Sequence, residues 1–161
     1  MVIHAGVVGW PDFEVAEPEL AAAGMALLGS YPEIAIGFLA TVSSSGLPHL
    51  APVCPIFCEE GLCLSVGLHT PKRRDLDGNG RYVLHAFLGA EDAEFKVSGL
   101  AERLEDAKAR RRVQAAIRFD AFGREDPIYR LWLSACMYCC WENVGRPGTR
   151  PVRRWWRADQ L

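Results

Sequence analysis

The residues best placed to bind a ligand lie at a junction between a predicted strand and a predicted helix, within residues 64–76. Apolar residues alternate up to Leu68, as in a strand, and Thr70 is a favoured helix N-cap that is followed by proline. A helix beginning there directs unpaired backbone N–H groups toward the end of the strand, with Lys72 and Arg73 beside them. Amide donors, a hydroxyl and two cations at one point favour the binding of a phosphate group.

The junction has a second interpretation, an ordinary strand-to-helix turn with a solvated basic patch, because turns of this composition also arise by chance. His49 and His69 lie near the ends of predicted strands close to the junction, so each is a candidate to line a site. His85 lies in the middle of a predicted strand, and we expect it to be a hydrogen-bonded core residue.

The six cysteines are interpreted as buried, reduced thiols rather than as metal ligands. Cys136 and Cys139 have the spacing of a CxxC metal motif, but they lie in a continuous apolar run. Positions three apart in a strand face opposite sides, so one metal ion could not readily bind both thiols. We also expect no disulfide framework, because the N-terminal residues lack the basic flank and the long apolar core of a secretory signal.

Length and composition suit one compact, cytosolic domain. The chain has 161 residues, half of them apolar, and a net charge of −2, which argues against a general nucleic-acid binder. A basic cluster, Lys108 with residues 110–112, is interpreted as the solvated face of a helix. No apolar run reaches the length of a membrane span, so we expect neither a nucleic acid nor a membrane as partner.

Residue patterns predict a mainly β fold of the α+β class, in which antiparallel strands joined by tight turns form a barrel decorated with helices. Residues 1–16 carry no clear pattern. Helices are predicted over residues 17–28, over 70–76, from the cap Asp106 to 117 and, as a short element, over 126–131. Strands are predicted over residues 34–43, 47–57, 62–68, 81–88, 93–104, 133–142 and 151–157.

Prolines mark the second predicted strand as unusual. Pro48, Pro52 and Pro55 interrupt residues 47–57, and proline cannot donate a hydrogen bond to a neighbouring strand. We therefore expect this strand to be bulged or to lie at a sheet edge. Backbone groups without a strand partner could then bind a ligand ring.

The order of these segments resembles that of the FMN-binding split-barrel proteins of the pyridoxamine 5′-phosphate oxidase-like family. The resemblance covers about residues 34–157. It is carried by residues 38–42 with 46–53 (the opening hairpin), 70–76 (the phosphate-binding turn), 94–101 (the fifth strand), and 138–141 with 151–156 (the closing strands).

This resemblance implies a six-stranded antiparallel split β-barrel with flanking helices, which forms a homodimer with two cofactor sites at the interface. Lys72 would bind the terminal phosphate of FMN, assisted by Thr70 and Arg73, and Trp156 would reach the partner's site. The other residues that it places along the flavin are Ser65 and Val66, near the ring and ribityl chain, and the backbone of His49, Leu50, Ala51, Pro52 and Val53.

The activity that the resemblance implies is an FMN-dependent oxidoreductase that transfers a hydride between the flavin and a small organic substrate. The alternatives are a reductase using the deazaflavin F420 and a protein that binds flavin or haem without turnover. No side chain stands out as a catalytic acid or base, and the substrate stays open. Arg150, Arg153 and Arg154 do not align with the substrate-phosphate ligands of the oxidase, which argues against pyridoxine phosphate.

Overall fold

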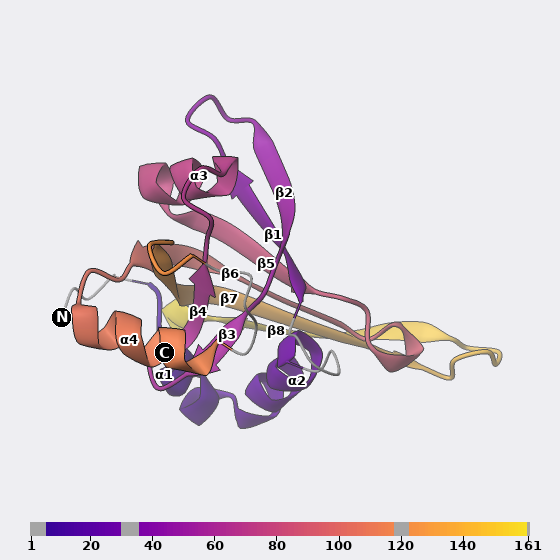
Figure 1. Cartoon of the computed structure of the whole chain (residues 1–161). Helices are drawn as coiled ribbons and strands as arrows, with labels where there is room; N and C mark the ends of the chain where they lie inside the picture. Colours follow the sequence, from indigo (N-terminus) through magenta and orange to yellow (C-terminus); the bar gives the residue numbers. More distant parts are fainter. Residues whose placement is uncertain (1–5, 30–35, 118–122, 161) are drawn as a thin grey trace.

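The computed structural model describes residues 6–29, 36–117 and 123–160, and its centre is a curled antiparallel sheet (Figure 1). In the described part of the chain, this sheet contains eight strands, which form a half-barrel. The strands are β1 (Gly37–Val42), β2 (Pro48–Val53), β3 (Ile56–Cys58), β4 (Gly61–Ser65), β5 (Arg81–Ala86), β6 (Glu94–Arg103), β7 (Ile128–Glu142) and β8 (Arg150–Arg157).

The strand order is β2-β1-β5-β6-β7-β4-β3, so β2 and β3 are the two ends of the path, and β8 pairs with β7 outside it. The long strand β7 joins two parts of the sheet. Its beginning pairs with β4 and its second half with β8, while β6 runs along most of its length. The far ends of β7 and β8 project away from the rest of the barrel (Figure 1).

Four helices flank the sheet among the described residues. Figure 1 shows α3 beside β1 and β2 at one end, α1 and α2 at the opposite end, and α4 near β3 and β4. No helix in this part of the chain is both long enough and apolar enough to cross a membrane. The helices are α1 (Trp10–Ala16), α2 (Pro18–Gly29), α3 (Pro71–Asn79) and α4 (Ala107–Ala116), with short 3-10 turns η1 (Ala90–Asp92) and η2 (Ala158–Gln160).

The main core lies between the sheet and helices α1 and α2. Phe13 on α1 is fully buried, and its ring centroid lies 4.8 Å from that of Trp156 on β8. Helix α2 approaches β6 closely at Gly24, where a Cβ atom would lie 2.4 Å from the ring of Phe95. Only glycine fits at such a contact. The helices therefore close one end of the barrel and leave α3 at the other.

The predicted fold class is confirmed, with three local differences. The predicted strand 47–57 is two strands, β2 and β3, divided at Cys54 and Pro55. The short helix predicted over 126–131 is wrong, because these residues form the turn into β7 and its start. Strand β4 supplies backbone partners there that override the local preference. Helix α1 was not predicted. Residues 34 and 35, the start of the first predicted strand, lie outside the described residues.

Candidate functional site

The strand-to-helix junction has the local structure that the sequence predicts. Thr70 is the N-cap of α3, and Pro71 occupies the first helical position. The Thr70 hydroxyl accepts a hydrogen bond from the backbone N–H of Arg73 at 3.4 Å and donates one to the carbonyl of Gly67 at 2.9 Å. The hydroxyl is therefore engaged in holding the turn. Pro71 has no N–H, and the N–H of Thr70 donates to the carbonyl of Gly67, so the N–H of Lys72 is the donor that this first turn leaves for a ligand.

The two predicted cations of the junction differ in their partners. The Nη1 atom of Arg73 lies 2.6 Å from Oδ2 of Asp77, one turn later in α3. Lys72 is half-buried and makes no ion pair with any described residue. The Nε atom of Arg73 is enclosed by protein and has no hydrogen-bond partner in the described structure. Lys72 is thus the cation that can give its full charge to an anion at this helix end.

A buried carboxylate ties α3 to the β1–β2 hairpin. The side chain of Asp75 is only 5% exposed. It accepts a hydrogen bond from the Thr41 hydroxyl on β1 at 2.6 Å and lies 2.7 Å from Nδ1 of His49 on β2. Burial by itself would raise the pKa of Asp75, but the hydrogen bonds from Thr41 and His49 outweigh it and lower the pKa below its ordinary value. The network fixes the position of the helix that presents Lys72.

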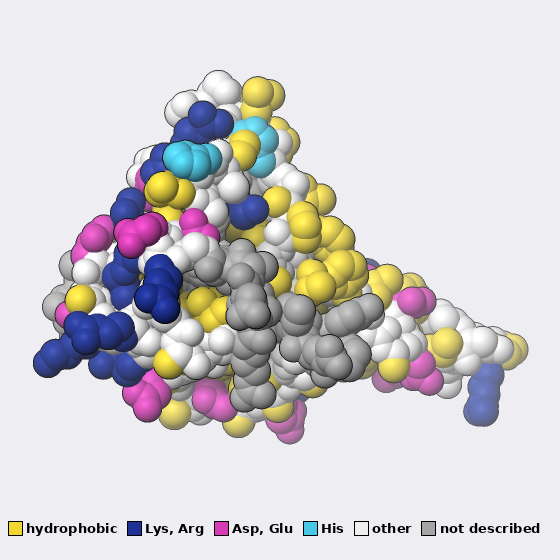
Figure 2. All heavy atoms as spheres, in the orientation of Figure 1, with side chains coloured by type: hydrophobic (Ala, Val, Ile, Leu, Met, Phe, Trp, Pro, Cys, Tyr) yellow, Lys and Arg dark blue, Asp and Glu magenta, His cyan; other side chains and the backbone are white. Residues whose placement is uncertain are grey.

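A pocket of about 290 Å³ lies between this helix and the β1–β2 turn. His49 and Asp75 line it together with hydroxyls of the turn and the exposed side chain of Arg74. Figure 2 shows histidine side chains beside Lys and Arg side chains over this end of the molecule. The full lining is Ser43, Ser44, His49, Pro71, Arg74, Asp75, Gly78 and Asn79.

Replacing Asp75 by asparagine should destabilise the fold by about 1–3 kcal/mol at pH 7, because the Thr41 and His49 donors lose their charged acceptor. The pKa of Asp75 is lowered in the native state, so its contribution is fully present above the ordinary aspartate pKa of about 4. It is lost as the pH falls through the lower native value. Urea denaturation at several pH values should therefore show that the difference in the free energy of unfolding between wild type and Asp75→Asn becomes smaller in acid.

Asp92→Asn is the matched control for this change. Asp92 is exposed and has a positive φ of 56°, a conformation that asparagine also tolerates. We expect this substitution to change the free energy of unfolding by less than about 0.5 kcal/mol at any pH. If the difference in the free energy of unfolding between wild type and Asp75→Asn stays constant from neutral pH to acid, the carboxylate charge contributes nothing to stability.

The second predicted strand is confirmed as an edge strand. Strand β2 pairs only with β1, with Pro48 opposite Val42 and Pro52 opposite Phe38. A proline is accommodated where its nitrogen faces away from the neighbouring strand, so alternation also turns the backbone of Leu50 outward. Pro48, Leu50 and Pro52 thus direct their carbonyl oxygens toward the open edge, where a ligand could bind them. Of these three residues, only Leu50 has an N–H group that can donate a hydrogen bond.

The three histidines occupy different environments. His49 lies against α3 as predicted, and His69 is exposed in the turn before Thr70. The interpretation of His85 as a core residue is wrong. Its side chain lies on the outer face of the sheet, in register with Phe38, and its Nδ1 atom is 2.5 Å from the carbonyl of Ala86. The junction therefore has two histidines near it.

Five other predicted residues have side chains that do not face an open surface. Ser65 and Val66 are buried where β4 ends, and the N–H of Val66 donates to the carbonyl of Pro127 at 3.0 Å. Trp156 is 4% exposed and packs in the core against Phe13, so its side chain does not face outward; the neighbouring Trp155 is the exposed one. Ala51 faces inward beside Leu39, and Val53 is buried, so only their backbone could meet a ligand.

Apolar side chains cover the outer face of β2, β1 and β5. The register places Leu50, Ala40 and Val83 side by side across the three strands, and Leu50 is 69% exposed. The rings of Phe38 and Phe87 lie beside this row, tilted to one another, with their centroids 4.7 Å apart. Figure 2 shows a continuous yellow surface along this side of the molecule. We call the side chains of Phe38, Ala40, Val42, Leu50, Pro52, Val83 and Phe87 the apolar face.

The cysteines are only partly as predicted. Cys63, Cys136 and Cys139 are buried, whereas Cys54, Cys58 and Cys140 are half-buried. Cys136 and Cys139 both lie within the continuous strand β7, where they face opposite sides. No group of three or more His, Cys, Asp or Glu side chains that could hold a metal ion occurs in the described part of the chain.

The sequence matches no protein-family model and none of the curated proteins that were searched. Solved structures with the same fold do exist. A heme binding protein from Mycobacterium smegmatis has a TM-score of 0.60 at 17% identity, over 86% of this chain and 58% of that one. The chain thus spans little more than half the length of that relative.

Two further structures match over nearly their whole length. One is a protein from Listeria innocua proposed to be a pyridoxamine 5′-phosphate oxidase, with a TM-score of 0.59 and 19% identity over 73% of this chain and 96% of that one. The other is PhzG from Burkholderia lata 383, solved in complex with tetrahydrophenazine-1-carboxylic acid, with a TM-score of 0.54 and 15% identity over 89% and 91%. These likenesses establish the split-barrel fold of the pyridoxamine 5′-phosphate oxidase-like proteins.

Proposed function

We propose that this chain is a flavin-binding split-barrel protein that holds the phosphate of FMN at the N-terminus of α3 and works as an oxidoreductase on a small organic substrate. The observation that carries the proposal is the half-buried Lys72, which has no ionic partner in the described chain and stands beside the capped start of α3. A cation beside a helix N-terminus with an N–H left to donate favours the binding of a phosphate.

The residues at this end of α3 fit a phosphate group. Arg73 adds a second positive charge to the first turn of α3, although its guanidinium is paired with Asp77. The carboxylates nearby are already engaged, since Asp75 is bonded to Thr41 and Asp77 to Arg73. Their negative charges are therefore partly offset by the donors that surround them.

FMN bound there would supply the redox chemistry, so the protein needs only to bind and orient it. Lys72 would hold the phosphate with its side chain and its backbone N–H. The outward backbone of β2, with the N–H of Leu50 and the carbonyls beside it, would bind polar atoms of the ring. F420 is the alternative ligand for the same residues.

The apolar face would be covered by a second copy of the chain. An exposed apolar surface that spans three strands is typical of an interface. A two-fold dimer formed through this face would bury β2, the edge strand next to α3, near the partner, so each cofactor site would lie at the interface. The apolar residues Leu133, Met137 and Cys139 of β7, by contrast, are buried within one chain and do not supply this surface.

Haem is a second candidate ligand, and a specific contact favours it. The Nδ1 atom of His49 is 2.7 Å from Asp75, which leaves Nε2 able to bind iron in the arrangement common to metal-bound histidines. The fold likeness to a heme binding protein points in the same direction. His49→Ala should abolish haem binding and leave FMN binding within a few-fold of wild type.

The test is the absorption spectrum of the purified protein, followed by titration with FMN, F420 and hemin under identical conditions. The proposal predicts saturable FMN or F420 binding, with one ligand per chain. For FMN it further predicts that reduced nicotinamide or another hydride donor bleaches the visible flavin absorbance. A Soret band with no flavin binding would support haem, and the absence of binding by all three ligands would contradict both candidates.

A further inference from the structure

The hairpin β3–β4 brings two cysteines together on one face. Cys58 pairs with Gly61, and Ile56 pairs with Cys63, so the two thiols occupy diagonal positions on the same side of the hairpin. The turn between them contains only Glu59 and Glu60. The two thiols are close enough for each to shift the pKa of the other.

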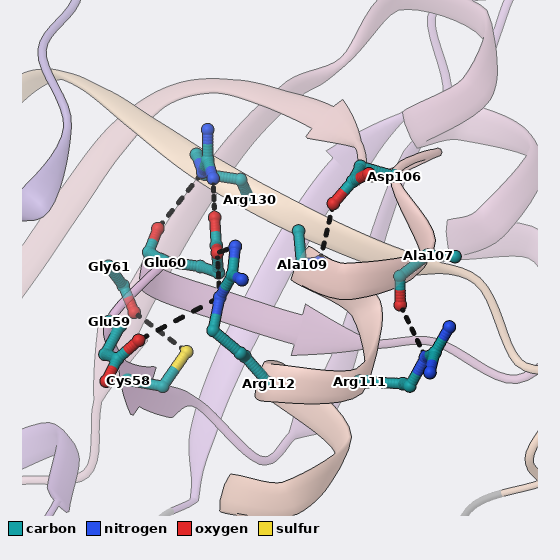
Figure 3. Close-up of polar contacts among 10 residues, drawn as sticks. All are labelled: Cys58, Glu59, Glu60, Gly61, Asp106, Ala107, Ala109, Arg111, Arg112 and Arg130. Atoms are coloured by element: carbon teal, nitrogen blue, oxygen red, sulfur yellow. Dashed lines mark hydrogen bonds and ion pairs between the residues drawn. The ribbon is translucent and has the colours of Figure 1, made fainter.

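The two thiols differ in access. Cys63 is fully buried in a small core with Ile56 and Val113, whereas Cys58 is half-buried at its border. The Sγ atom of Cys58 lies 3.9 Å from the carbonyl of Gly61, as Figure 3 shows. A small reagent can therefore reach Cys58 first and Cys63 only through it.

Charged side chains from three elements surround the hairpin turn (Figure 3). Glu60 is bonded to Arg112 of α4 and to Arg130 of β7, and Glu59 lies 3.9 Å from Arg112. The Nε atom of Arg130 also donates to the backbone carbonyl of Glu60 at 3.0 Å. The carboxylates are thus held by the arginines, and Arg130 contributes a positive charge near Cys58.

These surroundings make Cys58 the more acidic thiol of the pair. Its hydrogen bond with Cys63 lowers the pKa of Cys58 to about 7, although burial opposes this. The backbone at Glu60 and the charge of Arg130 also lower it, and the Glu60 carboxylate raises it. The pKa of Cys63 is raised by the same hydrogen bond and by burial, and burial also raises that of Cys54. At neutral pH Cys58 has a large thiolate fraction, which is the reactive form.

We propose that Cys58 and Cys63 are a redox-active pair that forms a reversible disulfide when the protein meets a peroxide. The Cys58 thiolate attacks the O–O bond of hydrogen peroxide, which gives a sulfenic acid and hydroxide. The sulfur of Cys63 then attacks the sulfenic sulfur, the S–S bond forms, and the hydroxyl leaves with the Cys63 proton as water. Two thiols are oxidised by two electrons, and one peroxide is reduced to two water molecules.

Closing the bond requires a small movement of β3. Diagonal neighbours are about 7–8 Å apart, slightly farther than the Cα separation that a disulfide usually spans. Strand β3 has only three residues and, within the described sheet, pairs with β4 alone at the edge. It can shift toward Cys63 without breaking another ladder.

The test treats a Cys54→Ser variant with hydrogen peroxide, blocks the remaining thiols and maps the bonds without reduction. Cleavage after Glu59 and Glu60 separates Cys58 from Cys63 in sequence, so their peptides stay together only if a disulfide joins them. We expect one linked pair, lighter by two hydrogen atoms and released by dithiothreitol. Unlinked peptides after peroxide treatment, or Cys58 recovered only as sulfinic acid, would overturn the proposal.

Two single-cysteine variants separate the roles. In Cys58→Ser, we expect Cys63 to stay reduced under the same treatment. In Cys63→Ala, Cys58 should stop at the sulfenic acid, which dimedone traps. Its alkylation by iodoacetamide at pH 7 should slow roughly tenfold, because the hydrogen bond that lowers its pKa is lost. Peroxide-driven oxidation of Cys63 in the absence of Cys58 would contradict the assignment of Cys58 as the attacking thiol.

Discussion

Replacing Lys72 by alanine should weaken FMN binding by roughly 10- to 100-fold, because a charge-assisted hydrogen bond to a phosphate contributes about 1.5–3 kcal/mol. Lys72 has no ionic partner among the described residues, so its removal leaves no carboxylate exposed without a cation. The stability of the fold should barely change. Isothermal titration of wild type and variant with FMN measures the difference directly.

Two comparisons make this prediction specific. Riboflavin lacks the phosphate, so its affinity should be nearly the same for wild type and Lys72→Ala. Lys108→Ala removes a lysine from the first turn of α4, on a different helix, and should leave FMN binding unchanged. Equal losses for FMN and riboflavin would show that Lys72 acts on the ring or on the fold instead of the phosphate.

Placing a carboxylate in the apolar face should weaken self-association of the chain by at least about 100-fold. Val83 lies on β5 within this face, between Ala40 of β1 and Ser98 of β6 on the neighbouring strands. In a two-fold dimer, Val83→Asp buries one unpaired charge from each chain, and such charges are costly to desolvate. Because Val83 is 38% exposed in a single chain, the monomer should still fold. Sedimentation velocity at micromolar concentration reports the outcome.

The matched control is Val15→Asp. Val15 is 85% exposed on α1, far from the three strands of the apolar face, and its substitution has the same chemistry. It should leave the dimer intact. FMN affinity should fall with the dimer in Val83→Asp and stay at the wild-type value in Val15→Asp. A wild-type protein that sediments as a monomer with FMN bound would contradict the proposed interface.

Local chemistry made the junction predictable from sequence. Capping by Thr70 and the preference for proline at the first helical position depend on neighbours within three residues, and α3 begins as expected. The prolines of β2 likewise predict an edge strand, because a proline has no N–H group to donate to a neighbouring strand, whatever its surroundings. These features need no knowledge of distant contacts.

Features that depend on distant contacts were not predictable. The partner of Asp75 is Thr41, 34 positions earlier in the chain, so an aspartate within a basic helix gave no sign of its burial. Trp155 and Trp156 face opposite sides of β8, and the assignment of Trp156 to an open site places it on the wrong face. The apolar face likewise emerges only when β1, β2 and β5 are aligned in register.

The most direct test of the central claim is to record the backbone amide resonances of isotope-labelled protein during titration with FMN and, separately, with riboflavin. If the phosphate binds at the N-terminus of α3, FMN should shift the amides of Lys72, Arg73 and Arg74 strongly, while riboflavin leaves them in place and shifts only those near the ring. Saturating FMN that shifts no amide in this first helical turn would contradict the account.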